Sequence, residues 1–376
     1  MKMWFSKNKK YLVDISLFLD IGAIDDTKQG VSHMVEHLLL SEKNKSIQTL
    51  INKNIYVNGY TTQDSMILQM KTQKHLVFFA VKTLLDHIFN FTISDKIFNA
   101  EKKLVLEEIK CNQPAKDNIG FMKFLSKISN KHIHSERGSL TSVKSITKRD
   151  VYTLYNKYIK PENSILSVTN NASFLTKQKL KRLTHKTKHI SPRINFDNTF
   201  RPVFLNQNLN LSTSHLFFAI NNNGMFDSEK HLFELFAIVF FSSLSPFWNT
   251  IRNELSLCYY IDYENIYIKN FGFLVLQIDA ENKNIKQILN ILTENLSINN
   301  LTKELFEKSK QNLLLRLIED YNENINFEAS LRKKLFNKKS NYKLNKKIIE
   351  NISYSNFYDF CKRIITNQEY SILIQQ

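Results

Sequence analysis

The sequence predicts an α+β fold in which two similar, duplicated α/β-sandwich halves face each other across a cleft. Segments of alternating apolar and polar residues, typical of strands, are interspersed with longer segments whose apolar residues recur at helical spacing. The order of these segments in the first half of the chain is repeated in the second half, roughly 200 residues further on. The length of 376 residues also matches two domains better than one.

The first half begins with a strand over residues 11–21, in which apolar residues alternate with polar ones until Gly22. The apolar spacing of residues 30–40 predicts a helix, and residues 47–51 continue helically. A pair of strands follows, and then four helices and a last strand. These elements are expected at 55–60, 65–71, 74–91, 94–110, 119–128, 148–158 and 164–169, with Ser94 or Asp95 as the N-cap of the helix at 94–110.

The second half repeats this order. A strand that Gly224 ends is followed by a helix, a strand pair and two further helices, expected at 215–221, 228–243, 259–267, 272–279, 284–296 and 302–321. Between the halves, residues 176–202 show no periodic pattern and contain Pro192 and Pro202. We therefore predict an N-terminal half at 1–175, a linker at 176–202 and a C-terminal half at 203–376.

Composition excludes several classes of protein. The net charge of +17 comes from scattered lysines without a basic-aromatic recognition motif, so we expect a solvated surface and no nucleic-acid partner; a preference for acidic substrates is a minor alternative. Asp14 and Asp20 interrupt the apolar N-terminal segment, which argues against a signal peptide. The longest uncharged run, 235–251, contains Pro246 and predicts a buried helix followed by a turn, with no membrane span. Three cysteines without a C-x-x-C pair indicate a reducing compartment, so we expect a cytoplasmic protein.

The predicted helix at 30–40 carries the strongest chemical signal, the sequence His33-Met34-Val35-Glu36-His37. His33 and His37 are four residues apart, so both imidazoles leave the same face of the helix, as two ligands of one zinc ion require. Glu36 borders that face, where it could accept a proton from an attacking water. The order H-x-x-E-H is the inverted form of the zinc-protease motif H-E-x-x-H. The alternative is that these are solvated or core histidines beside an unrelated acid.

A catalytic zinc site needs a third protein ligand. The predicted helix at 94–110 offers Glu101, Glu107 and Glu108. Glu101 and Glu108 are seven residues apart and share one face, whereas the side chain of Glu107 points about 100° away. Taken alone, acids at this spacing on a helix would simply be solvated.

Together these segments resemble the pitrilysin/insulinase family of inverted-motif zinc peptidases, in its short two-domain branch related to mitochondrial processing peptidase and its bacterial homologues. The resemblance covers most of the chain: the opening strand with Gly22, the H-x-x-E-H helix, the segment Asn58-Gly59-Tyr60-Thr61-Thr62 and the acidic helix. In the second half, Arg252 and Tyr259 match the family's Arg-x6-Tyr pair. The Gly-rich segment that commonly precedes this Arg is replaced by Ser242-Ser243-Leu244-Ser245-Pro246-Phe247, and the Gly-rich linker is also absent.

The resemblance implies a role for each matching residue. His33, His37 and Glu108 are expected to bind one Zn²⁺ per chain, Glu36 to act as general base and Glu101 to support the catalytic site. Asn58, Arg252 and Tyr259 are expected to hold the substrate. For the last two residues the structural alternative is that Arg252 pairs with Glu254 or a nearby acid and that Tyr259 packs in the core. The helix at 228–243 carries His231 and Glu234 but has Leu235 where a second His would be needed, so only the first half is expected to bind metal.

The expected function is that of a zinc-dependent metalloendopeptidase that hydrolyses short or unfolded peptides enclosed between the two halves. Its expected partners are the peptide substrate and a second subunit, in a homodimer or in a heterodimer with a related chain. One alternative is a dedicated protease that matures a peptide precursor or removes a leader together with a partner subunit. Another is a non-catalytic structural subunit of the same family, against which the intact set of His33, Glu36, His37 and Glu108 argues.

Overall fold

The computed structural model describes residues 1–6, 11–112, 116–169, 173–183, 200–222, 224, 229–269, 271–323, 342–367 and 370–376. Contacts divide this chain into two compact units. As far as the structure describes them, unit 1 contains Met1–Pro114 and Ile133–Asn195, and unit 2 contains Ala115–His132, Phe196–Phe327 and Ser340–Gln376.

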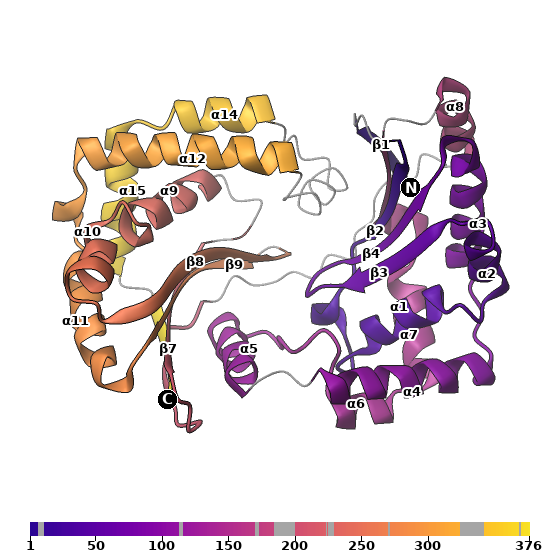
Figure 1. Cartoon of the computed structure of the whole chain (residues 1–376), viewed down its shortest axis with the longest axis horizontal. Helices are drawn as coiled ribbons and strands as arrows, with labels where there is room; N and C mark the ends of the chain where they lie inside the picture. The colour runs from indigo at the N-terminus through magenta and orange to yellow at the C-terminus, as the bar shows by residue number, and fades with distance from the viewer. Residues whose placement is uncertain are drawn as a thin grey trace. The chain divides into compact units, whose positions relative to one another are not determined.

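Unit 1 is built on a five-stranded sheet with the strand order β1-β5-β2-β4-β3 (Figure 1). The strands are β1 (Lys2–Ser6), β2 (Val13–Leu19), β3 (Tyr56–Thr61), β4 (Met66–Thr72) and β5 (Ser164–Thr169). β1 runs parallel to β5, and the other neighbouring pairs are antiparallel. The strand predicted at 11–21 is therefore β2 at the centre of the sheet, while the edge strand β1 was not predicted.

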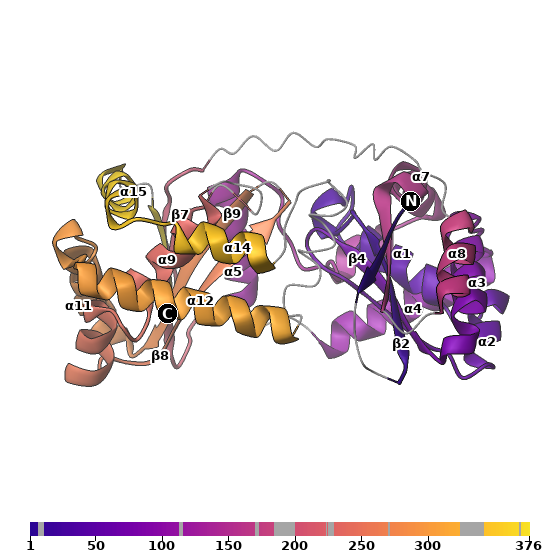
Figure 2. The same cartoon turned by 90° about the horizontal axis from the view of Figure 1, so that it is seen from above.

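Helices pack on the apolar face of this sheet, where alternate residues of β2 and β4 enter one hydrophobic core with the helices. α1 lies among β3, α4 and α7, and α3 lies between α2 and α8 (Figures 1 and 2). These helices are α1 (Val31–Leu40), α2 (Lys45–Ile51), α3 (Val77–Phe89), α4 (Asp95–Cys111), α6 (Leu140–Ser145), α7 (Lys148–Tyr158) and α8 (Phe174–Leu183), with short turns η1 (Ala23–Asp25), η2 (Lys74–Leu76) and η3 (Pro161–Asn163).

Unit 2 repeats the topology of unit 1. Its sheet has the order β6-β10-β7-β9-β8, again with one parallel pair, β6 with β10, and otherwise antiparallel neighbours. The strands are β6 (Phe204–Gln207), β7 (Ser214–Asn221), β8 (Cys258–Ile268), β9 (Phe271–Ala280) and β10 (Tyr370–Gln375). Each strand of unit 1 thus has a counterpart in unit 2, which confirms the predicted α+β fold with two similar halves.

One face of this second sheet carries a core shared with several helices. They are α9 (Lys230–Phe241), α10 (Pro246–Trp248), the π-helical turn η4 (Asn249–Glu254), α11 (Ile285–Asn295), α12 (Lys303–Glu323), α14 (Tyr342–Glu350) and α15 (Tyr354–Asn367), with turns η5 (Asn282–Asn284) and η6 (Ile298–Asn300). The strands β6 and β10 and the helices α14 and α15 were not predicted.

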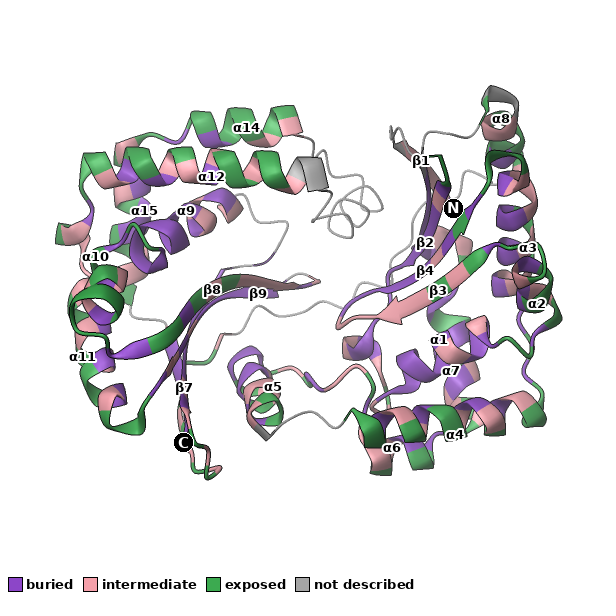
Figure 3. Cartoon of the chain, in the orientation of Figure 1, coloured by how far each residue is buried: buried purple, intermediate pink, exposed green. Residues whose placement is uncertain are grey.

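The segment Lys230–Glu254 is long and apolar enough to cross a membrane by length and composition, since it contains an 18-residue stretch with a mean hydropathy of 1.3. The structure divides this segment into α9, a turn, α10 and η4. Most of α9 is buried (Figure 3). Of the apolar 18-residue stretch, 67% is buried inside the protein, as in the core helix of a folded domain. The buried helix and following turn expected at 235–251 are therefore present.

The helix α5 (Lys116–Ser129) belongs to unit 2, although it lies within the first predicted half. It packs on the second sheet through β7, where the Phe121 and Phe217 rings are 4.6 Å apart. Phe217 points away from the core that its neighbours Leu216 and Phe218 enter, so α5 covers the opposite face. Contact between α5 and the sheet is close, because a Cβ on Gly120 would lie 2.1 Å from the side chain of Gln375.

The observed boundaries therefore differ from those predicted at 1–175, 176–202 and 203–376. Residues 115–132 leave the first half for unit 2, because an amphipathic pattern does not specify which sheet a helix covers. Residues 176–183 of the predicted linker are the end of α8, which packs against α3. Most of the remaining linker residues lie outside the described part of the chain.

Candidate metal centre and catalytic site

The helix α1 is fixed at its N-terminus by a buried carboxylate. Asp26 accepts hydrogen bonds from the backbone N–H of Gly30 and of Ser32, each 2.8 Å long. Burial of this side chain raises the pKa of Asp26 to about 7, although these hydrogen bonds act in the opposite direction. The apolar residues of α1 are buried in the core of unit 1. The capped and buried helix therefore provides a rigid base for His33 and His37.

His33, His37 and Glu108 form a compact cluster in unit 1. The Glu108 Oε2 atom lies 3.3 Å from His37 Nε2 and 3.7 Å from His33 Nε2. One ligand atom from each residue lies within 4.8 Å of the others. Bonds of about 2.0–2.1 Å in a tetrahedral zinc site place ligand atoms about 3.3 Å apart, so this set of donors fits zinc. Among the described residues, no other group of His, Cys, Asp and Glu side chains is comparably placed.

The two histidines differ in their electrostatic surroundings. Burial, aided by His37 and Arg137 and opposed by Glu108, lowers the pKa of His33 to about 4. Burial also acts to lower the pKa of His37, but Glu101, Glu36 and Glu108 outweigh it, so the pKa is raised. The buried Nδ1 atom of His33 has no hydrogen-bond partner in the described structure, whereas His37 Nδ1 faces Glu101. Near neutral pH His33 is therefore neutral, the form in which an imidazole binds a metal.

The helix α4 provides both acids that face α1. Ser94 caps this helix by accepting a hydrogen bond from the backbone N–H of Ile97. The side chain of Glu107 points to solvent, where it pairs with Lys110 at 2.7 Å. Glu108, on the neighbouring face, is the residue that reaches the two histidines. Arg137, His33 and His37 outweigh the effect of burial and lower the pKa of Glu108.

Glu101 lies beside the cluster and is 4% exposed. Its Oε1 atom accepts hydrogen bonds from Ser41 Oγ at 2.7 Å and Lys43 Nζ at 2.9 Å, while Oε2 lies 3.7 Å from His37 Nδ1. Burial would raise the pKa of Glu101, but these three partners lower it to about 2. The carboxylate is therefore ionised and can orient the ring of His37, as acids beside metal-binding histidines commonly do.

Glu36 is 8% exposed and is held by the edge strand β3. Thr61 Oγ1 donates a hydrogen bond of 2.9 Å to Glu36 Oε2. A Cβ on Gly59 would lie 3.2 Å from Glu36 Oε1, so a glycine allows the strand to approach closely. Burial raises the pKa of Glu36 despite the hydrogen bond from Thr61. Sequence reasoning did not single out Thr61, although it lies within the segment that suggested Asn58.

Asn58 itself lies away from this carboxylate. It is exposed on β3, and strand alternation places it on the opposite face from Gly59 and Thr61. The structure therefore brings His33, His37, Glu36, Glu101 and Glu108 together, but not Asn58.

Arg252 and Tyr259 lie in unit 2, at η4 and at the start of β8. Arg252 Nη1 donates a hydrogen bond of 2.6 Å to the carbonyl oxygen of Cys258. Glu254, the partner considered for Arg252, instead accepts from Asn249 at 2.6 Å. The Tyr259 side chain is 51% exposed and does not pack in the core.

The counterpart of α1 in unit 2 is α9, and there a lysine and a histidine of the same helix contact its acid. Glu234 pairs with His231 Nδ1 at 2.7 Å and with Lys230 Nζ at 3.1 Å. Burial would raise the pKa of Glu234, but Lys230 and His231 lower it to about 2. Leu235 occupies the position of the missing histidine, and among the described residues no group of His, Cys, Asp and Glu side chains at metal-ligand spacing includes Glu234.

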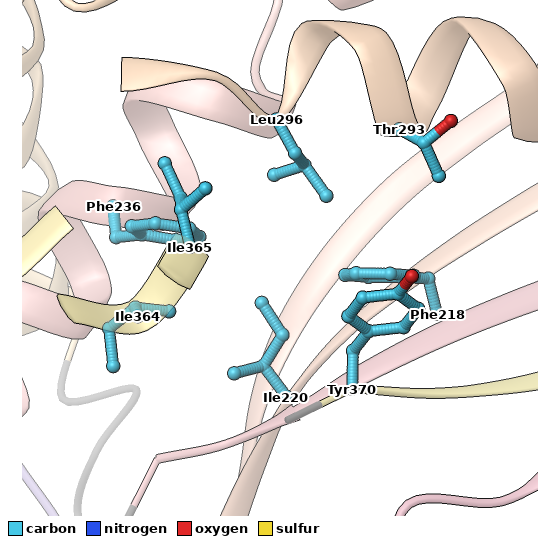
Figure 4. Close-up of a pocket in the computed structure, with 8 residues that line it drawn as sticks. All are labelled: Phe218, Ile220, Phe236, Thr293, Leu296, Ile364, Ile365 and Tyr370. Atoms are coloured by element: carbon cyan, nitrogen blue, oxygen red, sulfur yellow. The ribbon is translucent and has the colours of Figure 1, made fainter. Parts of the chain in front are cut away.

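An apolar pocket in unit 2 offers no comparable chemistry (Figure 4). Of its lining residues, only Thr293 and Tyr370 carry side-chain polar atoms, and the Thr293 hydroxyl bonds to carbonyl oxygens of its own helix. The pocket is lined by Phe218, Ile220, Phe236, Thr293, Leu296, Ile364, Ile365 and Tyr370.

Comparisons with known proteins find family models that match both halves of the chain. Residues 3–137 match the family model described as Insulinase (Peptidase family M16), and residues 145–313 match that of the Peptidase M16 inactive domain. The cluster of His33, His37 and Glu108 lies within the first match, while Arg252 and Tyr259 lie within the second. A comparison with curated proteins finds no match.

Solved structures with the same fold include a protease from Helicobacter pylori, with 13% sequence identity and a TM-score of 0.75 over 98% of this chain and 95% of that one. A peptidase M16 inactive domain from Pseudomonas fluorescens has 12% identity and a TM-score of 0.81, covering 99% and 95% of the two chains. A chain of complex III2 from Candida albicans has 12% identity and a TM-score of 0.79, covering 99% and 93%. At these identities the similarity establishes the fold alone.

Proposed function

Because the chain belongs to the insulinase family, peptidase family M16, we propose that it is a zinc-dependent endopeptidase that hydrolyses short or unfolded peptides. The observation that carries the proposal is the juxtaposition of two histidines and a carboxylate at zinc-ligand spacing with the buried acid Glu36. One zinc ion per chain is proposed, with His33, His37 and Glu108 as its ligands. Bound there, zinc would supply a Lewis acid that polarises the scissile carbonyl and acidifies water.

Glu36 is proposed as the general base and later general acid. Its burial raises the pKa of the carboxyl group towards the working pH, which favours both acceptance of a proton from water and its return to the leaving amine. Thr61 holds one carboxylate oxygen, so the other remains available for the proton. Glu101 is proposed to keep the ring of His37 oriented.

The second unit is proposed to hold the substrate. Hydrolysis builds negative charge on the carbonyl oxygen, and donors placed beside that oxygen typically contribute about 3–4 kcal/mol. Tyr259 offers an exposed hydroxyl, and Arg252 carries a guanidinium close to it in sequence. Asn58, exposed on the edge strand β3, is a further candidate for contact with the peptide.

The test combines metal content with product analysis. The protein is expected to contain about one zinc per chain and to cleave members of a mixed peptide library, and a chelator should abolish this cleavage. Mass spectrometry identifies the products of the library. A stably folded protein offered as substrate should remain uncleaved if substrates are enclosed between two halves. A zinc-loaded protein that yields no products, or cleavage that persists after complete metal removal, would refute the proposal.

A second candidate is a structural subunit, and the similarity to a chain of complex III2 favours considering it. A third candidate is a protease that matures a peptide precursor together with a related subunit. For both the structural subunit and the maturation protease, we propose a homodimer or a heterodimer. Absence of zinc from the purified protein would favour the structural role, and co-purification with a related chain would favour the paired protease. A cytoplasmic location is proposed because all three cysteines are free thiols.

A further inference from the structure

Arg137 contacts the carboxylate of Glu108 on the oxygen that does not face the histidines. Arg137 Nε donates a hydrogen bond of 2.7 Å to Glu108 Oε1. The other oxygen, Oε2, lies 3.3 Å from His37 Nε2 and 3.7 Å from His33 Nε2. The two oxygens therefore have separate partners, and the guanidinium leaves the proposed ligand atom free.

The loop that carries Arg137 is anchored on both sides of this residue. Gln63 Nε2 donates hydrogen bonds of 2.7 Å to the carbonyl oxygen of His134 and to Glu136 Oε1. Gly138 follows with a φ of +75°, a conformation that favours glycine. A Cβ on Gly30, at the start of α1, would lie 2.6 Å from the carbonyl oxygen of Arg137, so the loop rests directly on the metal-binding helix. These contacts fix the backbone from which the guanidinium reaches Glu108.

We propose that Arg137 is a positioning residue that holds Glu108 as a one-oxygen ligand of the metal. The Glu108 side chain is 29% exposed and would otherwise be able to turn towards solvent or to bind through both oxygens. A hydrogen bond to Oε1 fixes the plane of the carboxylate and directs Oε2 towards His33 and His37. Partners of this kind typically strengthen metal binding about 10- to 100-fold. The inference rests on the metal site of the proposed function, not on peptidase activity.

Two other roles for Arg137 predict different results. The Arg137 side chain is 46% exposed, and an ion pair at such a surface contributes little to stability, so a purely structural role would leave zinc affinity unchanged. If the guanidinium instead competed with the metal for Glu108, its removal would strengthen zinc binding. The direction of the change therefore decides between these roles.

The experiment measures zinc affinity of the full chain by competition with a chromophoric chelator. Arg137→Met should weaken zinc binding about 10- to 100-fold, while Arg137→Lys should weaken it less because it keeps a donor and a charge. Arg149→Met is the matched control, since Arg149 is an exposed arginine on α7 outside the site. The metal-free Arg137→Met and Arg149→Met proteins should have equal melting temperatures.

Unchanged affinity of Arg137→Met, within about twofold of the control, would overturn the inference, and so would tighter binding. Failure of the wild-type protein to bind zinc would instead refute the proposed function.

Discussion

Replacing Glu36 by Gln separates the chemical step from metal binding, because the two side chains have nearly the same shape. Space beside Gly59 is limited, since an added Cβ there would lie 3.2 Å from Glu36 Oε1, and the amide oxygen of Gln can still accept the hydrogen bond from Thr61. The amide cannot accept a proton, however, so the variant should lose the contribution of the general base. That contribution is typically 10²- to 10⁴-fold, or roughly 3 to 5 kcal/mol in the activation free energy.

The pKa of Glu36 also predicts how this variant responds to pH. Because the folded-state pKa is raised above the usual 4.5, the folded metal-free protein binds this proton more tightly than the unfolded chain does. Ionisation of Glu36 therefore costs stability as pH rises above 4.5. The metal-free Glu36→Gln protein should melt at a higher temperature than wild type at pH 7. The difference should shrink as pH falls from the raised folded-state pKa towards 4.5, and it should be nearly absent below 4.5.

The assay compares kcat/KM for one cleaved peptide at matched zinc content, with Glu42→Gln as the control. Glu42 is exposed just beyond α1, so its substitution makes the same chemical change outside the site. A Glu36→Gln enzyme that is fully zinc-loaded and retains kcat/KM within about threefold of wild type would show that Glu36 is not the base.

Three further outcomes are expected. Glu108→Ala should lose zinc while Glu107→Ala retains it, as measured by elemental analysis, because only Glu108 faces the histidines; full zinc in Glu108→Ala would contradict this ligand set. Metal-free Glu101→Gln should have a lower melting temperature than wild type at pH 7, because a carboxyl group with a lowered folded-state pKa stabilises the fold only while it is ionised. The difference in melting temperature should narrow as pH falls from 4.5 towards the folded-state pKa of about 2. Tyr259→Phe should lower kcat/KM at least tenfold with zinc retained. Tyr260 is similarly exposed, and Tyr260→Phe should leave kcat/KM unchanged. Equal activities of the two variants would show that Tyr259 does not hold the substrate.

Local periodicity was sufficient to locate most elements near their observed positions. The helix α7 (Lys148–Tyr158) and the strand β5 (Ser164–Thr169) have the predicted bounds. The strands β1, β6 and β10 were missed, and they lie near the chain ends or beside the proline-rich segment. Their place in the sheets depends on pairing with distant strands, including the parallel pairs β1–β5 and β6–β10. Periodicity within a short segment carries no information about such partners.

The sequence alone determined the duplicated fold and the placement of His33, Glu36 and His37 on one helix, because spacing along a helix fixes which side chains lie together. Only the tertiary structure decided which groups reach that helix from elsewhere. Thr61 and Glu36 are 25 residues apart, and Arg137 and Glu108 are 29 apart, so these contacts depend on how strands, helices and loops pack. The assignment of α5 to unit 2 has the same cause, since an amphipathic pattern does not specify which sheet a helix covers.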